Sequence, residues 1–305
     1  MTVIPIHPAR LPDFQPLEPP SGRGRLWVRP ALDSPGFGPR DLFVWQADGA
    51  GADGPCPVLY LQDGQNLFEA GRVPFGVAWE IDRCASDLID AGRIPPLLVV
   101  GIASTGNRLI DYAPDAILSR LAPDSRHRIE TAYGGLPGPN GYAAFVVGTV
   151  KPLIDRLFPT APDPASTFIV GSSMGGVAAV DIWARYPGVF GGIAALSGHF
   201  SLLPVGDLPP PPETFVRDVA AAVRAFALER LPPAGRHRFW LDRSERDLDQ
   251  YYGPAHEALV SALNQLGYTS GQDMISRSYA GVGHNEAAWR DRLQDVLPFL
   301  LGPRP

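Results

Sequence analysis

The chain has 305 residues, of which 45% are hydrophobic and 19% charged, and its formal net charge is −6. This balance predicts a globular protein with a large core, and the spread negative charge argues against nucleic acid or an anionic membrane as the main partner. No apolar run approaches the ~18 residues of a membrane span, and the two cysteines, Cys56 and Cys84, form neither a disulfide framework nor a metal-binding spacing.

Residues 1–24 are rich in proline and predict an extended arm on the surface. The arm contains no apolar segment of the signal-peptide type, so the expected location is the cytoplasm. We expect a single domain over residues 25–305, since there is no internal repeat and no second hydrophobic core.

Strand and helix patterns alternate along the rest of the chain. Expected strands are 25–29, 41–46, 57–62, 96–102, 167–170, 191–196, 238–241 and 274–279. Expected helices are 79–92, 141–158 with a kink at Pro152, 177–183, 214–231, 252–266 and 285–301. Residues 103–140 are expected to form a long polar loop with one short helical piece near 114–121.

This order of elements predicts an α/β fold. The first two strands form a hairpin, and the later strands form a mostly parallel central sheet of about eight strands with helices on both faces. Active sites in such sheets lie at the carboxyl ends of the strands.

One of these ends carries Gly171-Ser172-Ser173-Met174-Gly175, directly between an apolar strand and a helical pattern. A G-x-S-x-G sequence in this context is typical of a nucleophile elbow, which exposes the central serine on a tight turn. The register selects Ser173, because the residue two before Ser172 is Val170. Ser173 is therefore the candidate nucleophile.

A serine hydroxyl needs a base within hydrogen-bond reach. His284 is the best candidate, because it follows the last strand in a glycine-containing loop and comes last in the order Ser, Asp, His. His199 follows the sixth strand and could line the substrate pocket. The other histidines are expected to be surface or packing residues: His7, His127, His237 and His256.

The acid that orients the histidine should follow the seventh strand, where four carboxylates lie between residues 242 and 249. Asp247 is favoured, because it lies in the loop where a side chain can reach across to His284. Asp249, and after it Asp242 or Glu245, remain alternatives.

The oxyanion of an acyl-transfer intermediate needs preorganised donors. We expect one from the backbone N–H of Met174 and the other from the loop Asp63-Gly64-Gln65, with Gly64 allowing close approach and Gln65 donating its N–H. The alternative is an ordinary Asp-Gly turn. Neither a zinc motif nor a phosphate-binding glycine loop is present, so no metal or cofactor is predicted.

These residues resemble the esterase branch of the α/β-hydrolases, which includes enterochelin esterases, feruloyl and acetyl-xylan esterases and S-formylglutathione hydrolase. The resemblance covers roughly residues 40–302 and is carried by residues 58–68, Trp79, residues 101–108, residues 171–176, residues 283–286 and Trp289.

The resemblance implies an α/β-hydrolase fold, Ser173 as nucleophile, His284 as base and oxyanion donors at Gln65 and Met174. It also implies that Arg108 and Tyr112 face the acyl or alcohol pocket.

This chain departs from members of the branch at two places. Members commonly have histidine where Gln62 stands and Gly-Thr where Ser244-Glu245 stand. In members with the Gly-Thr pair, the acid lies three residues after that glycine, which corresponds to Asp247 in this chain. Relatives with a Leu-Asp pair further along the loop instead indicate Asp249, which follows Leu248 here.

The predicted function is a serine carboxylic-ester hydrolase that acts through an acyl-enzyme on a small-molecule ester. Acyl transfer on the same residues and a non-catalytic binding protein on a hydrolase fold are the alternatives. The segments 103–140 and 198–212 are expected to wall the pocket.

Overall fold

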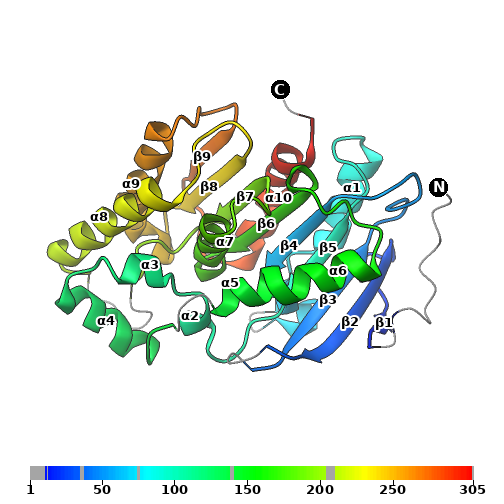
Figure 1. Ribbon diagram of the computed structural model, residues 1–305, viewed down its shortest axis with the longest axis horizontal. Coiled ribbons are helices and arrows are strands. Elements are labelled where there is room, and N and C mark those ends of the chain that lie inside the picture. Colours follow the sequence, from blue (N-terminus) through cyan, green and yellow to red (C-terminus); the bar gives the residue numbers. More distant parts are fainter. Residues whose placement is uncertain are drawn as a thin grey trace.

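A computed structural model describes residues 11, 13–34, 38–73, 76–137, 141–203 and 210–303. Residues 1–10 and 12 of the proline-rich arm lie outside the described residues, and so do residues 204–209 of the expected pocket segment 198–212. Figure 1 shows a central sheet with helices packed on both of its faces.

The sheet has nine strands in the order β1-β2-β3-β5-β4-β6-β7-β8-β9. Their bounds are β1 Gln15–Leu17, β2 Arg25–Leu32, β3 Arg40–Gln46, β4 Val58–Gln62, β5 Leu98–Ile102, β6 Thr167–Ser172, β7 Gly192–Leu196, β8 Arg238–Ser244 and β9 Met274–Tyr279. The pairs β1–β2, β2–β3 and β3–β5 are antiparallel, and all others are parallel. The predicted α/β fold with a mostly parallel sheet is therefore confirmed.

The ninth strand comes from the arm, part of which is not a free surface segment. Strand β1 pairs with β2 in the register Gln15↔Val28, and the neighbouring Phe14 is buried. Further along, the backbone N–H of Ser21 donates to Asp82 at 2.8 Å. Strand β2 would otherwise leave a row of backbone groups unpaired at the sheet edge, and β1 satisfies them.

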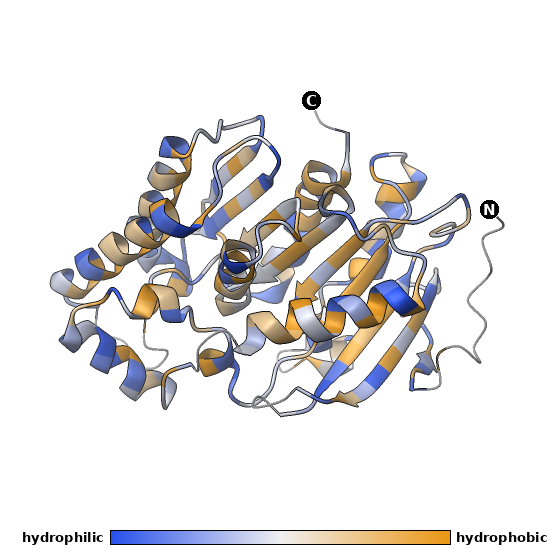
Figure 2. Ribbon diagram, viewed as in Figure 1, coloured by the Kyte–Doolittle hydropathy of each residue, from blue (hydrophilic) through white to orange (hydrophobic). Residues whose placement is uncertain are grey.

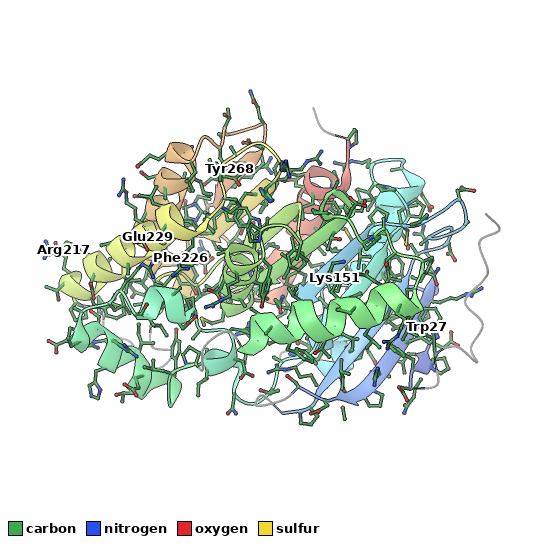
Figure 3. All side chains as sticks on the ribbon, viewed as in Figure 1. Trp27, Lys151, Arg217, Phe226, Glu229 and Tyr268 are labelled. Carbon is green, nitrogen blue, oxygen red and sulfur yellow. The ribbon has the colours of Figure 1, made fainter. Side chains whose placement is uncertain are left out.

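The helices lie in two layers. In the view of Figure 1, α5 (Gly141–Phe145), α6 (Lys151–Leu157) and α7 (Met174–Arg185) lie in front of the sheet, whereas α1 (Ile81–Asp90) and α10 (Glu286–Leu301) lie behind it. Helices α8 (Glu213–Arg230) and α9 (Gly253–Gln265) pack against each other near β8 and β9. Side chains fill the space between these layers (Figure 3).

The expected kink at Pro152 takes the form of a change in helix type. A π-helical turn over Val146–Val150 separates α5 from α6, and Pro152 lies in the first turn of α6. Proline has no N–H to donate back along a helix, so the hydrogen-bond pattern is interrupted just before it.

The expected long loop 103–140 contains more helix than predicted. It forms α2 (Arg108–Asp111), α3 (Asp115–Leu118) and α4 (Pro123–Tyr133). Helix α4 begins with a proline in its first turn and ends at Gly134, whose φ is 78°. A proline at the start and a glycine after the end are typical helix-boundary signals. The helix was not predicted because the apolar residues between them show only a weak helical periodicity.

The central strands are buried along their whole length, which explains their continuously apolar sequences (Figure 2). Both cysteines are free and buried, as predicted. Among the described residues, none of the helices combines the length and apolar character needed to cross a bilayer.

Candidate active site

The predicted elbow has the backbone that a sharp strand-to-helix turn requires. Strand β6 ends at Ser172, α7 begins at Met174, and Ser173 between them has φ 53° and ψ −125°. A Cβ on Gly171 would lie 2.2 Å from the carbonyl oxygen of Gly175, so only glycine permits the turn. The turn holds Ser173 at the carboxyl end of the strand in a conformation that L-residues rarely adopt.

His284 lies between Ser173 and a buried carboxylate. Its Nε2 is 3.0 Å from the Oγ of Ser173, and its Nδ1 is 2.5 Å from Oδ1 of Asp249. The imidazole also makes T-shaped contacts with two aromatic rings, with centroid distances of 5.0 Å to Trp289 and 5.8 Å to Tyr252. The structure thus brings together three side chains from the turn between β6 and α7, from η6 and from the loop before α10.

The expectation that Asp247 reaches the histidine ring is wrong. Its Oδ2 instead accepts the backbone N–H of His284 at 3.0 Å. The chain turns at Asp247, where φ is 55°, and the short 3₁₀ helix η6 (Asp247–Tyr251) then directs Asp249 inward. Asp249 is fully buried, and it is this second carboxylate that meets the ring.

The two remaining carboxylates of this loop have other partners. Asp242 accepts the N–H of Ser197 at 2.8 Å and the indole N–H of Trp240 at 2.7 Å. Glu245 accepts the hydroxyl of Ser278 at 2.7 Å. Neither contacts His284, so Asp242 and Glu245 do not fit the role of the histidine-orienting acid.

Asp249 is held by a network that the sequence analysis missed. Its Oδ2 accepts the backbone N–H of Ser244 at 2.5 Å, and the Ser244 hydroxyl donates to the carbonyl of Gly283 at 3.0 Å. Arg292 of α10 donates to that same hydroxyl and to Asp242, the latter at 2.5 Å. Ser244 therefore links the acid, the histidine loop and a buried ion pair, and Arg292 gave no local signal of this contact.

Burial by itself would raise the pKa of Asp249, but the hydrogen bond and charge interaction with His284, together with hydrogen bonds from Ser197 and Ser244, outweigh the burial. The net result is a pKa below the usual value. Asp249 is therefore ionised at neutral pH, as required of a group that stabilises an imidazolium.

The loop after β4 has the geometry expected for an oxyanion site. Asp63 has φ 58°, and the following turn η2 (Gly64–Asn66) brings Gly64 so close to β5 that a Cβ would lie 2.4 Å from the carbonyl carbon of Gly101. The Gln65 side chain bonds Ser104 twice, at 2.9 and 3.0 Å. Met174 begins α7, so its N–H has no carbonyl partner within that helix.

Arg108 lies at the predicted place but is paired within the protein. Its Nε and Nη2 donate to the two oxygens of Asp63, each at 2.7 Å. Tyr112 lies beneath this pair, accepts the backbone N–H of Asp63 at 3.4 Å and is buried. Arg108 and Tyr112 thus brace the loop after β4, and Tyr112 does not line the cavity described below.

His199 lines the cavity, yet both of its ring nitrogens have protein partners. Nε2 donates to the carbonyl of Leu203 at 3.1 Å, which leaves Nδ1 to accept the Tyr252 hydroxyl. Burial, with a further contribution from His284, lowers the pKa of His199 to about 3. The ring is therefore neutral and supports the cavity wall beside Ser173.

A cavity of about 760 Å³ opens over Ser173 and His284. Gln65, Met174, Arg108 and Glu286 also line it. Its apolar wall consists of Val77, Leu109, Leu248, Ala287 and Trp289. Gly64 does not reach this cavity and acts only through its close approach to β5.

Comparisons with known proteins agree with this fold. Residues 50–300 match the model of the family described as "Putative esterase". The chain is 31% identical over 268 residues to the iron(III) enterobactin esterase of Dickeya dadantii (strain 3937), a match that covers 85% of this chain and 51% of that protein. It is 29% identical over 149 residues to the uncharacterized protein YbbA of Bacillus subtilis (strain 168), covering 48% of this chain and 51% of that protein. The matched regions thus span about half the length of these curated relatives.

Solved structures show the same architecture at low sequence identity. A ferulic acid esterase matches with a TM-score of 0.62 at 17% identity, covering 92% of this chain and 98% of the other. The ferric enterobactin esterase of Salmonella typhimurium matches with a TM-score of 0.60 at 20% identity, covering 93% and 61%. The family match spans most of the sequence, and the fold is that of its structural neighbours. The chain therefore belongs to this esterase family of α/β-hydrolases.

Proposed function

We propose that the protein is a serine carboxylic-ester hydrolase in which Ser173 is the nucleophile, His284 the base and Asp249 the orienting acid. The observation that carries the proposal is the unbroken hydrogen-bond path from Ser173 Oγ through His284 to Asp249. A serine, an imidazole and a buried carboxylate joined in this order are the parts that acyl transfer needs.

In the proposed reaction, His284 Nε2 takes the proton of Ser173 as Oγ attacks the ester carbonyl. The imidazolium is stabilised by Asp249, and the oxyanion accepts the N–H groups of Met174 and Gln65. His284 then returns the proton to the leaving alcohol, which leaves an acyl group on Ser173. Water, deprotonated by His284, releases the acid and regenerates the enzyme.

A loop after β8 that lacked an acid in reach of His284 would favour the binding-protein alternative. Asp249 contacts the histidine although this loop departs from that of other members, and the contact supports the catalytic proposal. Acyl transfer to an alcohol would use the same groups and differ only in the acceptor. The substrates named for relatives, ferulic acid and enterobactin esters, are proposals for this chain.

The test is hydrolysis of p-nitrophenyl acetate and butyrate, with fluorophosphonate labelling of the same samples. Ser173→Ala should lose labelling and reduce kcat by at least about 10³-fold, because the nucleophile is removed. Ser119→Ala, at an exposed position after α3, is the matched control and should keep both. Equal turnover and labelling in wild type and Ser173→Ala would refute the proposal, and an ester product formed with added alcohols would reveal acyl transfer.

A further inference from the structure

Glu286 is a buried acid that the proposed chemistry does not use. It is the first residue of α10, only 6% exposed, and it lines the cavity over Ser173. Within the described part of the chain, its carboxylate makes neither a hydrogen bond nor an ion pair. An acid in the first turn of a helix is favoured by the helix dipole, and Glu286 is not among the fully enclosed unpartnered atoms, so its carboxylate is accessible from the cavity that it lines.

The charges around the cavity do not cancel. Among the described lining residues, the charged ones are Asp63, Arg108 and Glu286. Arg108 uses its Nε and Nη2 on Asp63 and interacts with Glu286 only through longer-range charge attraction. The Asp63–Arg108 pair is neutral as a unit, so Glu286 leaves the described lining with one excess negative charge.

A second acceptor without a partner belongs to Asn66, another residue of the lining. Oδ1 of Asn66 is buried without a hydrogen-bond partner in the described structure, and Asn66 belongs to the turn that carries Gln65. A carboxylate and an amide oxygen both require hydrogen-bond donors. Asn66 Oδ1 is enclosed by protein atoms and cannot meet a substrate, whereas the carboxylate of Glu286 is not among these fully enclosed acceptors and can meet a donor that a bound substrate brings.

We propose that Glu286 forms an acceptor subsite that binds a hydroxyl or ammonium group of the ester substrate and disfavours anionic substrates. The inference rests on the proposed function, because it concerns the same cavity. A hydroxyl or ammonium that reaches Glu286 donates a charge-assisted hydrogen bond to its carboxylate, and an ammonium gains charge attraction as well. A carboxylate on the substrate would instead be repelled by the charge of Glu286.

The experiment uses esters of matched shape and different charge, because the side of the scissile bond that faces Glu286 is not fixed in advance. One series varies the alcohol: butyrate esters of choline, 3,3-dimethylbutanol, 1,3-propanediol and 3-hydroxypropionate. The other varies the acid: methyl 4-trimethylammoniobutyrate, methyl 5,5-dimethylhexanoate and monomethyl glutarate. Acid release is followed by titration at constant pH, for wild type and Glu286→Gln.

In at least one series, wild type should prefer the cation over the anion in kcat/KM. Glu286→Gln should reduce that ratio by about tenfold or more, with the neutral isostere changing least. An effect of Glu286 on the nearby His284 would be common to all substrates and would cancel in the ratio. The propanediol ester shows whether a hydroxyl is sufficient or an ammonium is required.

Glu229→Gln is the matched control, since Glu229 lies in the last turn of α8, is exposed, pairs with Arg120 and does not line the cavity (Figure 3). Its ratios should equal those of wild type. If Glu286→Gln left the cation-to-anion ratio unchanged in both series while Ser173-dependent hydrolysis persisted, the acceptor subsite would be wrong and the hydrolase proposal would stand. If wild type hydrolysed none of the esters, the proposed function would fail first.

Discussion

The elbow around Ser173 and the loop around Asp249 are both needed for the proposed site, but they are specified differently. The elbow is mainly a local structure, because its turn is set by the close approach of Gly171 to Gly175 four residues later, although Gln62 and the segment after β7 also pack against it. The loop after β8 is held by long-range contacts, from Ser244 to Gly283 and from Asp242 to Arg292. The conformation of the elbow can be predicted from a short sequence motif. The conformation of the loop after β8 depends on residues that are distant in the sequence, so it cannot be predicted from the loop sequence alone.

The strongest test of this difference replaces each of the two neighbouring carboxylates, Asp249 and Asp247, by an amide in separate variants. Asp249→Asn should reduce kcat by about 10⁴-fold, because the amide cannot stabilise an imidazolium and can favour the wrong ring tautomer. Asp247→Asn should cost about tenfold or less, because an amide oxygen can still accept the His284 N–H. Both are measured on p-nitrophenyl butyrate, with thermal unfolding to confirm that each variant is folded.

A drop of similar size in both variants would mean that the loop acts as one unit and that the distinction between the two carboxylates is wrong. A large loss in Asp247→Asn alone would return the acid to Asp247. Either outcome would require the loop to rearrange when substrate binds.

The sequence was sufficient for most of the fold because its cues are local and repeated. Apolar runs predicted eight strands, Asn285 predicted the start of α10, and its side chain indeed accepts the N–H of Ala288 at 3.0 Å. Strand β1 was missed because three residues near prolines carry no periodic pattern, and it forms only where β2 offers an edge. Propensity alone does not predict such a strand.

The same reasoning explains why the candidate site was only partly predictable. Ser173 and His284 follow strand ends in recognisable loops, so their meeting follows from topology. Which of Asp247 and Asp249 meets the histidine depends on the positive φ of Asp247 and on the short 3₁₀ helix that begins there. No pattern in the sequence predicts either of these two features. Arg292 and Ser244 lie in different elements, and their contact requires the folded packing of α10 against β8.

The second test removes the long-range support beneath the acid. Arg292→Leu leaves the fully buried Asp242 without its cation and should lower the free energy of unfolding by about 3–5 kcal/mol. Arg217→Leu, which breaks an exposed pair with Glu213, should cost at most about 1 kcal/mol. Urea unfolding measures both free energies.

The double variant Asp242→Asn/Arg292→Leu removes the unpaired buried charge of Asp242. Its free energy of unfolding should therefore be higher than that of Arg292→Leu alone. If Arg292→Leu were as mild as Arg217→Leu, the buried pair would not be what holds the loop. The loop around Asp249 would then depend on long-range contacts no more than the elbow around Ser173 does.

The smallest expected effect concerns His199, which borders the elbow and whose backbone N–H donates to the Ser173 carbonyl at 3.1 Å. Its pKa is about 3 in the fold and 6.5 when unperturbed, so the unfolded chain binds an extra proton between these values. Stability therefore falls as the pH drops from about 6.5 toward 3. Between pH 7 and pH 5 this one group should remove about 2 kcal/mol.

His199→Gln keeps a neutral donor and acceptor but cannot be protonated, so its loss of stability between pH 7 and pH 5 should be smaller than that of wild type by about this amount. Urea unfolding at the two pH values gives the comparison, and His127→Gln, at an exposed position on α4, is the matched control that should follow wild type. An identical loss in wild type and His199→Gln would mean that His199 is protonated in the fold or exchanges its partners. The wall beside Ser173 would then respond to acid, and the elbow would depend on distant contacts as the acid loop does.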